Sequence, residues 1–365
     1  MKRKFDWKNP GSLALALVLA LLVGAGIMAL TGHNPWLAYR ELCRGATGCS
    51  SWREFFTALF TKRPFGNTLE YAMVLFLTGL ACAIGARVGI FNVGGEGQLY
   101  LGAIVSAYIG VKLSAWPAWA VIPIAAVSAM AVGGFYAWIP GILKVKGKVN
   151  EVITTIMMNS IAIFFCAYLS NGPWKTAQGN RVSGTDTLSA ALRFPKLIRG
   201  SNLTTAIFVS AILALGIWYV MTKTSRGLEM KFIGDNPRFA RYLGLKVDST
   251  VIASMVISGA LCGLVGMFQV YGVRGNYQDG ISNEYYFDGL LVAMIMQYKS
   301  AGIIFMSFLF AFLKVGAAGM ELEAGVPGEL YRILQAVIIF FLAAQRGAGQ
   351  LLRLRLSRKE GKVRG

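Results

Sequence analysis

The sequence predicts an all-α, polytopic membrane protein with about ten transmembrane helices, some of them short or broken, and with both termini in the cytoplasm. Only 15% of the 365 residues are charged and 55% are hydrophobic, whereas a soluble protein carries roughly 25% charged residues. Apolar runs of about 20 residues, the length that spans a bilayer, recur along the chain. We expect helices because lipid offers the backbone no hydrogen-bond partner.

Ten apolar segments are expected to cross the membrane. The first follows Lys2, Arg3 and Lys4 and so resembles a secretion signal, but it is too long and lacks a small-residue cleavage site, so we expect a retained helix. An N-terminal tail (1–10) and a charged C-terminal tail (346–365) flank the membrane domain (11–345). The ten segments lie at 11–31, 67–88, 97–113, 117–140, 150–170, 203–222, 250–271, 285–298, 301–318 and 330–345.

The charge distribution predicts the topology. Ten spans place both termini on one side, and most of the 36 Lys and Arg residues fall on that side, which the positive-inside rule assigns to the cytoplasm. The formal net charge of +19 is therefore a topology signal, and we expect no nucleic-acid partner. The long loops at 32–66 and 171–202 become extracytoplasmic and the loop at 223–249 cytoplasmic, while the basic tail is expected at the cytoplasmic lipid surface.

Residues 89–98, GIFNVGGEGQ, combine three glycines with the polar side chains of Asn92, Glu96 and Gln98 between two apolar segments. Glycine permits backbone conformations that other residues resist, and irregular backbone in a membrane is tolerated only where protein or a water-filled cavity covers it. Two interpretations are open: a broken helix lining a solute pathway, or a tight cytoplasmic turn in which Glu96 caps a helix. No Lys-Ser or Lys-Thr follows the glycines, so this is not a phosphate-binding loop.

The cytoplasmic loop contains DNPRFARYLG, which has its own helix signals. Asp235 or Asn236 suits the N-cap, Pro237 the first helical position and Gly244 the position after the end. Aromatic and aliphatic side chains recur at helical spacing within it. A short helix with such a face outside the membrane indicates a partner protein with a groove; the alternative is a helix lying on lipid headgroups.

Other chemistries find little support in the sequence. Cys43 and Cys49 lie close together in the 32–66 loop and could form a disulfide if that loop faces an oxidising compartment. The lone His33 and the cysteine spacing predict no metal site. There is no nucleotide-binding lysine motif and no Ser-His-Asp or Cys-His set, so we expect no catalytic residues in this chain.

Five stretches between residues 65 and 345 occur in a characteristic order: FNVGGEGQLYLGA, GKVNEVITTIMMNSIA, GLEMKFIGDNPRFARYLGLKV, YFDGLLVAMIMQYKSAGIIFMSFLFAFLKVGAAGM and GVPGELYRILQAVIIFFLAA. Together they resemble the permease subunits of bacterial ABC importers, in the simple sugar and nucleoside branch of the family that includes ribose and branched-chain amino acid permeases. The form of the first stretch is more similar to the nucleoside branch than to the ribose or amino-acid branches.

The resemblance implies the other parts of an importer in the bacterial cytoplasmic (inner) membrane. Two permease chains, often different subunits, would form the pathway within the lipid. A cytoplasmic ATPase would bind ATP and Mg, an extracytoplasmic lipoprotein would deliver the solute, and this chain would bind no cofactor itself. The segment that matches the family's ATPase-coupling helix comprises Gly234, Asp235, Asn236, Pro237, Arg238, Phe239, Ala240, Arg241, Tyr242, Leu243 and Gly244.

A pathway for nucleosides should combine aromatic faces with polar groups and bind the solute weakly. Glu151 and Asn159 stand about 80° apart around a helix and could share a face, although Glu151 could instead cap its helix and the aromatic residues could simply pack. The pathway candidates are Phe91, Asn92, Glu96, Gln98, Asn150, Glu151, Asn159, Tyr271, Phe287 and Asp288, and the wider region includes Gln269, Tyr285 and Tyr286.

The sequence therefore predicts the transmembrane permease subunit of an ATP-driven importer for nucleosides, with purine nucleosides first. Ribose-like simple sugars are the alternative solute. Two alternatives of another class are a stand-alone ion-coupled transporter, which needs no ATPase-docking helix, and a membrane-embedded enzyme, which needs convergent acids, a metal cluster or a nucleophile pair.

Overall fold

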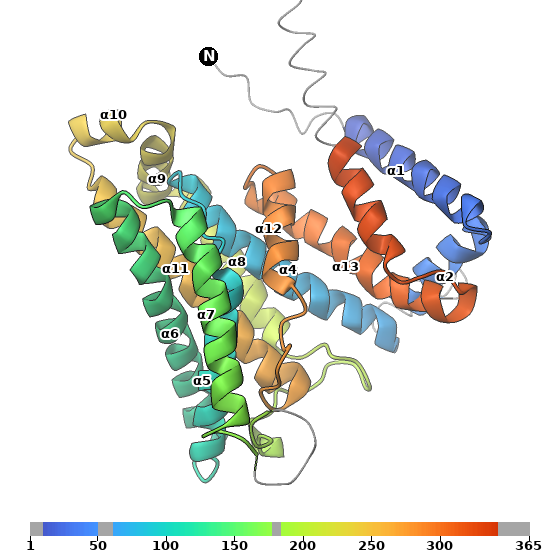
Figure 1. The fold of residues 1–365 in the computed structure, drawn as a ribbon, viewed down its shortest axis with the longest axis horizontal. Helices are drawn as coiled ribbons and strands as arrows, with labels where there is room; N and C mark the ends of the chain where they lie inside the picture. The colour runs from blue at the N-terminus through green and yellow to red at the C-terminus, as the bar shows by residue number, and fades with distance from the viewer. Residues whose placement is uncertain (1–9, 50–60, 177–183, 342–365) are drawn as a thin grey trace, which may run out of the picture. The chain divides into compact units, whose positions relative to one another are not determined.

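The computed structural model describes residues 10–49, 61–176 and 184–341, and helices dominate these parts of the chain (Figure 1). The chain divides into two compact units. One combines the described parts of Met1–Ala58 and Phe312–Gly365, and the other is Leu59–Ala311. The boundary falls within helix α13 (Ser300–Ala324), which contributes to both units.

The first unit contains α1 (Pro10–Leu30), α2 (Pro35–Thr47), the end of α13 and the helix Leu330–Phe341. The axes of α1 and α2 differ by 120°, because the chain turns through Gly32 and the Asn34 side chain then caps α2 by accepting from the Trp36 and Leu37 N–H groups. Helix α2 occupies part of the expected 32–66 loop. Hydropathy did not predict it because its apolar stripe is too short for a span.

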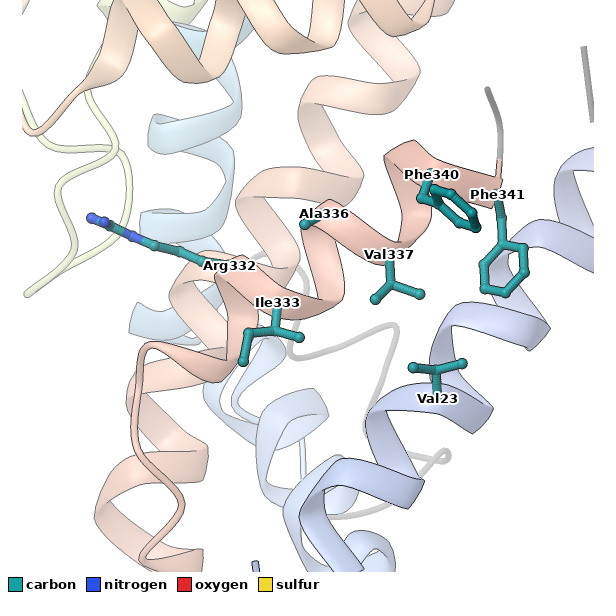
Figure 2. Close-up of a pocket in the computed structure, with 7 residues that line it drawn as sticks. All are labelled: Val23, Arg332, Ile333, Ala336, Val337, Phe340 and Phe341. Atoms are coloured by element: carbon teal, nitrogen blue, oxygen red, sulfur yellow. The ribbon is translucent and has the colours of Figure 1, made fainter. Parts of the chain in front are cut away.

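A cavity of about 550 Å³ lies in the first unit between α1 and the helix Leu330–Phe341. Figure 2 shows Val23 of α1 opposite Val337 and Phe341, with Arg332 pointing away from them. The lining is almost entirely apolar, as expected for helices that face lipid or one another in a membrane. No predicted site residue lines this cavity.

The second unit is built around α4 (Arg63–Arg87) and α11 (Val247–Phe268). In their most apolar stretches 89% and 72% of residues are buried, which places them at the centre of the unit. Helices α5 (Gly95–Lys112) and α6 (Ala118–Gly147) pack against α11 at glycine contacts. A Cβ at Gly263 would lie 2.2 Å from the Ala129 carbonyl oxygen, so only glycine allows α6 and α11 to approach this closely.

The outer helices of this unit are α6, α7 (Glu151–Asn171) and α8 (Ala206–Lys223), whose apolar stretches are only 28%, 28% and 22% buried. Their exposed side chains are large and apolar, which is the arrangement for contact with lipid. At one end, α8 leads into α9 (Ser225–Asp235) and α10 (Pro237–Tyr242). Figure 1 shows α10 beyond the ends of the longer helices; we call this the α10 end.

At the opposite end, the segment 184–205, which contains the 3-10 turn η2 (Ala190–Leu192), packs onto the chain that follows α11. Its backbone N–H groups donate to carbonyl oxygens there, from Leu188 to Gly275 at 2.8 Å and from Phe194 to Tyr271 at 2.9 Å. Tyr277 is completely buried in this contact, and burial raises the pKa of its hydroxyl well above the ordinary value. This expected loop is therefore a packed element.

All ten expected spans coincide with helices, but not all are long enough to cross a bilayer. Six helices qualify by length and hydropathy, and up to seven do if the bent pair of α1 and α2 counts as one span. The helices α12 (Tyr285–Ile295) and Leu330–Phe341 are shorter apolar helices. The described chain is thus a polytopic helical membrane protein, whereas the count of ten spans stays a prediction. The expected tails, apart from the start of α1, lie outside the described residues.

Candidate functional site

The stretch GIFNVGGEGQ forms a buried turn between α4 and α5. Gly89 has a φ of 81°, which lets the chain leave α4 sharply. The Asn92 side chain then folds back, with its Oδ1 accepting from the Gly94 N–H at 3.0 Å. Its Nδ2 donates to Gln98 Oε1 and to Ser258 Oγ, both at 2.9 Å, and Gln98 Nε2 donates to Asn92 Oδ1 at 3.2 Å. These bonds close the turn on itself and tie it to α11.

Helix α7 contacts the same turn through one face. Asn159 Oδ1 accepts from the Gly97 N–H at 2.8 Å, and Asn159 Nδ2 donates to the Val93 carbonyl oxygen at 2.8 Å. One turn earlier on the same face, Thr155 Oγ1 accepts from the Val93 N–H at 3.3 Å. The irregular backbone thus finds side-chain partners on a neighbouring helix, which is what permits it inside a membrane protein.

Helix α12 covers the turn from another side. The Tyr286 ring lies over Gly95, where an added Cβ would be 2.0 Å from a ring carbon, and the Tyr286 hydroxyl donates to the Asn92 carbonyl oxygen. The Tyr286 N–H donates to Glu96 Oε2 at 3.1 Å. Glu96 therefore lies in the first turn of α5 and also satisfies a backbone N–H in the first turn of α12. Its carboxylate therefore bonds to the start of α12, while α5 itself has Gly94 at its N-cap and no side-chain cap.

Helix α12 has only 11 residues and so is about 16 Å long, roughly half of a 30 Å hydrocarbon core. Left-handed backbone occurs at both of its ends, at Glu284 (φ 61°), Gln297 (φ 51°) and Tyr298 (φ 59°). Residues with side chains seldom adopt this conformation. The Phe91 ring contacts the Tyr298 ring with 6.0 Å between centroids, so the turn touches this end of α12 as well.

The other predicted pathway residues have varied surroundings. Asn150 caps α7 through bonds from the Val152 and Ile153 N–H groups, and Glu151 pairs with Lys144 at 2.7 Å. Tyr271 lies in the π-helical turn that follows α11, fully buried, with its hydroxyl donating to the Ser106 carbonyl oxygen at 3.0 Å. The structure therefore does not bring all ten candidates together.

The candidates that do meet belong to the turn and to α12. Asn92, Glu96, Gln98 and Asn159 are buried in the turn network described above, while Phe91 and Phe287 are partly exposed beside it. Asp288, in the first turn of α12, accepts from the Tyr71 hydroxyl at 2.7 Å and joins α12 to α4.

Sequence reasoning missed Glu70, which lies inside α4 and is buried. Gln269 Nε2 donates to Glu70 Oε1 at 2.7 Å. Gln269 begins η3 (Gln269–Arg274), a π-helical turn that continues α11. The sequence signal was available, because an acid within an apolar span is a candidate functional residue in its own right. Its partner lies 199 residues away along the chain and could not be predicted.

The predicted coupling segment contains the last two residues of α9 and the whole of α10. Asn236 caps α10 by accepting from the Arg238 and Phe239 N–H groups at 3.1 Å, Pro237 is its first residue, and Gly244 follows its end with a φ of 77°. The short helix and its caps are thus confirmed, with Asn236 rather than Asp235 as the cap. Gly234 lies against the end of α4, where a Cβ would be 2.3 Å from the Arg87 carbonyl oxygen.

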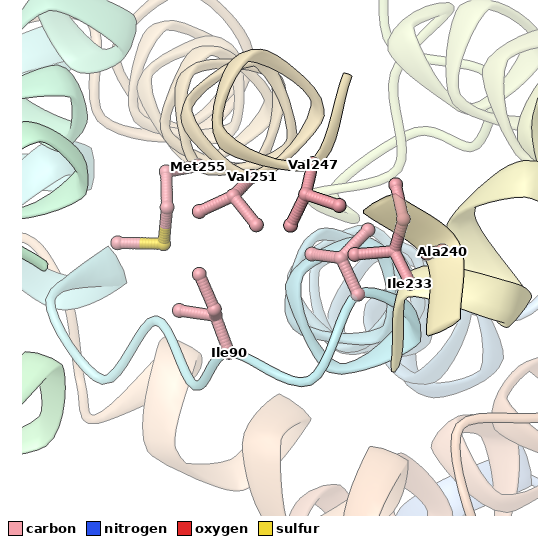
Figure 3. Packing of buried hydrophobic residues seen from close by; sticks show 7 residues of the cluster. Ile90, Ile233, Ala240, Val247, Val251 and Met255 are labelled. Carbon is pink, nitrogen blue, oxygen red and sulfur yellow. The ribbon is translucent and has the colours of Figure 1, made fainter. Parts of the chain in front are cut away.

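One small side chain anchors α10, while its larger side chains remain exposed. Ala240 is fully buried in a cluster that joins α9, the start of α11 and the turn after α4 (Figure 3). Phe239 and Leu243 are about half exposed, and Tyr242 is 91% exposed. The members of this cluster, which we call the coupling cluster, are Val88, Ile90, Ile233, Ala240, Val247, Val251 and Met255.

Other reactive groups are few in the parts of the chain that the structure describes. Cys43 lies in α2 and Cys49 follows its C-cap glycine, and both are free thiols, so the disulfide considered above is not formed there. Across the described residues, no group of three or more His, Cys, Asp or Glu side chains could hold a metal ion. The buried acids among these residues have other partners: Glu70, Glu96 and Asp288 bond to glutamine, backbone or tyrosine groups, while Glu41 and Glu151 pair with Arg44 and Lys144.

Comparison with known proteins gives a consistent result. The chain is 33% identical to the guanosine ABC transporter permease protein NupP of Bacillus subtilis, over 90% of this chain and 92% of that protein. It is also 33% identical to the nucleoside ABC transporter permease protein NupB of Lactococcus lactis, over 91% and 90% of the two chains. The glucose ABC transporter permease protein TsgB13 of Haloferax volcanii is 29% identical, over 92% and 87%. No solved structure matches the chain.

A family match covers most of the membrane domain. Residues 65–343 match the family described as the branched-chain amino acid transport system / permease component. This range includes the buried turn, α12 and the coupling segment, and it agrees with the resemblance found between residues 65 and 345. The chain therefore belongs to this permease family and is a membrane transport subunit rather than an enzyme.

Proposed function

We propose that this chain is the pathway-forming permease of an ATP-driven importer for nucleosides, with purine nucleosides favoured. The observation that carries the proposal is the exposed face of α10, Phe239, Tyr242 and Leu243, held on a buried anchor at Ala240. A groove on a partner protein would cover an exposed helix face of this kind. The similarity to permeases named for guanosine and nucleosides supports the solute class.

The proposed topology has ten spans with both termini in the cytoplasm of a bacterium. Basic residues at the α10 end support it, because the positive-inside rule places such a cluster in the cytoplasm. The four helices α4, α6, α8 and α10 each carry Arg or Lys in the last turn at this end. The exposed apolar faces of α6, α7 and α8 would then contact lipid or a second permease chain.

The partners follow from this orientation. An ATPase subunit, with ATP and Mg bound to it, would cover α10. A second permease, often a different chain, would complete the pathway, and an extracytoplasmic lipoprotein would meet the opposite end. The basic tail (346–365) would lie on anionic lipid at the cytoplasmic surface.

The coupling cluster provides a route from α10 to the buried turn. Movement of α10 would displace Ala240, which packs with Ile233 and with Val88 and Ile90. Ile90 directly precedes Phe91 and Asn92, and Tyr286 connects that turn to α12. ATP binding by the partner would thereby shift α12, whose short length and left-handed ends suit a moving element. The pathway would run beside Phe91, Phe287 and the polar groups of the turn.

A double substitution tests the ATPase contact. Phe239→Asp with Leu243→Asp places two charges on the exposed face of α10, and we expect ATP-driven uptake of guanosine to fall at least tenfold while membrane insertion stays normal. The matched control is Arg226→Gln with Lys231→Gln, two exposed positions on α9 that give the same change in net charge. Reconstituted vesicles report uptake, and co-purification reports whether the ATPase subunit is retained.

The outcomes separate the alternatives. Normal uptake and normal ATPase retention by the double variant would remove the docking role from α10. Full transport by vesicles that lack ATP would instead support an ion-coupled transporter. The similarity to a glucose permease supports simple sugars as the alternative solute. Uptake of glucose or ribose, with no inhibition of that uptake by guanosine, would favour this alternative.

A further inference from the structure

Glu70 and Gln269 form a buried polar pair that belongs neither to the hydrogen-bond network of the turn nor to the coupling segment. Glu70 lies on α4 and Gln269 at the start of η3, and both side chains are buried, Gln269 completely. Their contact, from Gln269 Nε2 to Glu70 Oε1, is 2.7 Å long, a short distance typical of a hydrogen bond to a carboxylate. The donor end of the Gln269 amide is therefore directed at Glu70.

The acceptor end of the same amide has no partner. Gln269 Oε1 is buried and accepts no hydrogen bond from any residue that the structure describes. Buried amide oxygens are normally hydrogen-bonded, because an unmet acceptor loses its water without a replacement. A donor supplied from outside the chain would satisfy this oxygen.

One aromatic residue, Tyr285, lies close enough to the pair to interact electrostatically with Glu70. Its ring meets the Tyr71 ring edge to face, with 5.3 Å between centroids. The Tyr71 hydroxyl donates to Asp288. Carboxylate and amide oxygens beside aromatic rings suit a ligand that presents hydroxyl donors and an apolar face. A sugar ring has both properties.

The backbone around the pair is irregular. Gln269 is the first residue of the π-helical turn that ends α11, and π-helical insertions are frequent at functional sites. Glu284, which precedes Tyr285, has left-handed backbone. The chain segments on either side of the pair, η3 and the start of α12, thus both depart from regular α-helix.

We propose that Glu70 and Gln269 bind hydroxyl groups of the sugar moiety of the transported solute, and so determine its specificity. The proposal rests on the proposed function and deepens it. Gln269 Oε1 and the Glu70 carboxylate each accept from a hydroxyl, while the Tyr71 and Tyr285 rings lie beside the sugar. A solute that lacks these hydroxyls leaves the acceptors unmet and is rejected.

The test compares two solutes in vesicles that contain the complete importer. One is guanosine, and the other is its 2′,3′-dideoxy analogue, which lacks both ribose hydroxyls. We expect the unmodified importer to take up guanosine at least about tenfold faster, since each buried acceptor left without a donor is costly. Glu70→Gln and Gln269→Met keep the side-chain sizes, and each should reduce that ratio to within about threefold, mainly by slowing guanosine.

A matched control is Ser307→Ala on α13. Ser307 is also fully buried with an unpartnered oxygen, but on a different helix, and its loss should leave the ratio unchanged. If either variant fails to reach the membrane, the other variant and the control still decide the question. An unchanged ratio in a variant that transports guanosine overturns the assignment of the pair, and so does an unmodified importer that does not distinguish the two solutes. An unmodified importer that takes up no nucleoside overturns the proposed function itself.

Discussion

Two buried polar clusters in the second unit differ in how completely they are hydrogen-bonded. In the turn at 89–98, the Asn92 and Gln98 amides bond to each other, and the Asn159 amide bonds to backbone groups of the turn, so all three amides are engaged. In the pair of Glu70 and Gln269, one buried acceptor stays open. A closed network fixes a structure, whereas a buried amide with one end bonded and the other open can accept from a further donor. We therefore assign the turn mainly to positioning and the pair to the solute.

The closed network should be sensitive to loss of any member, and Asn159→Leu should have the largest effect. It removes the partners of the Gly97 N–H and the Val93 carbonyl oxygen together, and we expect the free energy of unfolding to fall by about 3 kcal/mol. Thermal unfolding in detergent measures it. Ser160→Leu, on the exposed side of the same helix, is the control and should be nearly neutral. Equal stability of the two variants would contradict a structural role for the turn.

The fit between the turn and α12 should come next in size. Gly95→Ala places a Cβ within 2.0 Å of the Tyr286 ring, and we expect a loss of about 2 kcal/mol from overpacking. Gly216→Ala on α8 meets no atom within 4 Å and should instead gain about 0.5 kcal/mol, because alanine favours a helix. Melting temperatures that rise for both variants would show that the Tyr286 ring moves aside at little cost, which would contradict a tight fit between the turn and α12.

A smaller effect is expected for Glu96→Gln. The amide can still accept from the Tyr286 N–H, but the negative charge at the start of α5 is lost, which should cost about 1 kcal/mol. We expect slower uptake as well, because Glu96 joins α5 to α12. Normal stability together with normal uptake would reduce Glu96 to a replaceable helix cap.

The open pair should behave in the opposite way to the turn. Glu70→Leu combined with Gln269→Leu removes a buried charge and an unmet acceptor, so we expect the free energy of unfolding to stay within about 1 kcal/mol or to rise. Uptake should nevertheless be lost. Gln269→Leu alone leaves Glu70 buried without its partner and should be less stable than the double variant. If the double variant is as unstable as Asn159→Leu, the contrast between the two clusters fails.

Much of the helical framework could be predicted from the sequence. Hydropathy located ten segments that are all helical, because apolar runs of this length admit few other structures. The Asn-Pro pair and the Gly244 stop located α10, because caps and breakers act over a few residues. The glycines of GIFNVGGEGQ likewise marked a break in the helices correctly.

The partners of these local features could not be predicted. The turn is closed by Asn159 and Tyr286, which lie 62 and 194 residues away from the groups they bond. Glu70 and Gln269 meet across 199 residues. The π-helical turn and the left-handed ends of α12 have no clear sequence signal, since Glu284 and Tyr298 are not residues that favour such backbone. One sequence does not reveal contacts of this range.

The left-handed residues at the two ends of α12 have a consequence for stabilising the protein. Glycine at positions 284, 297 or 298 would relieve backbone strain of roughly 1 kcal/mol per site. A thermostability screen would therefore tend to select such glycines. Glycine at these sites would lower the energy of the starting conformation of α12 relative to the shifted conformation. We therefore expect the most heat-resistant variants to be among the slowest importers.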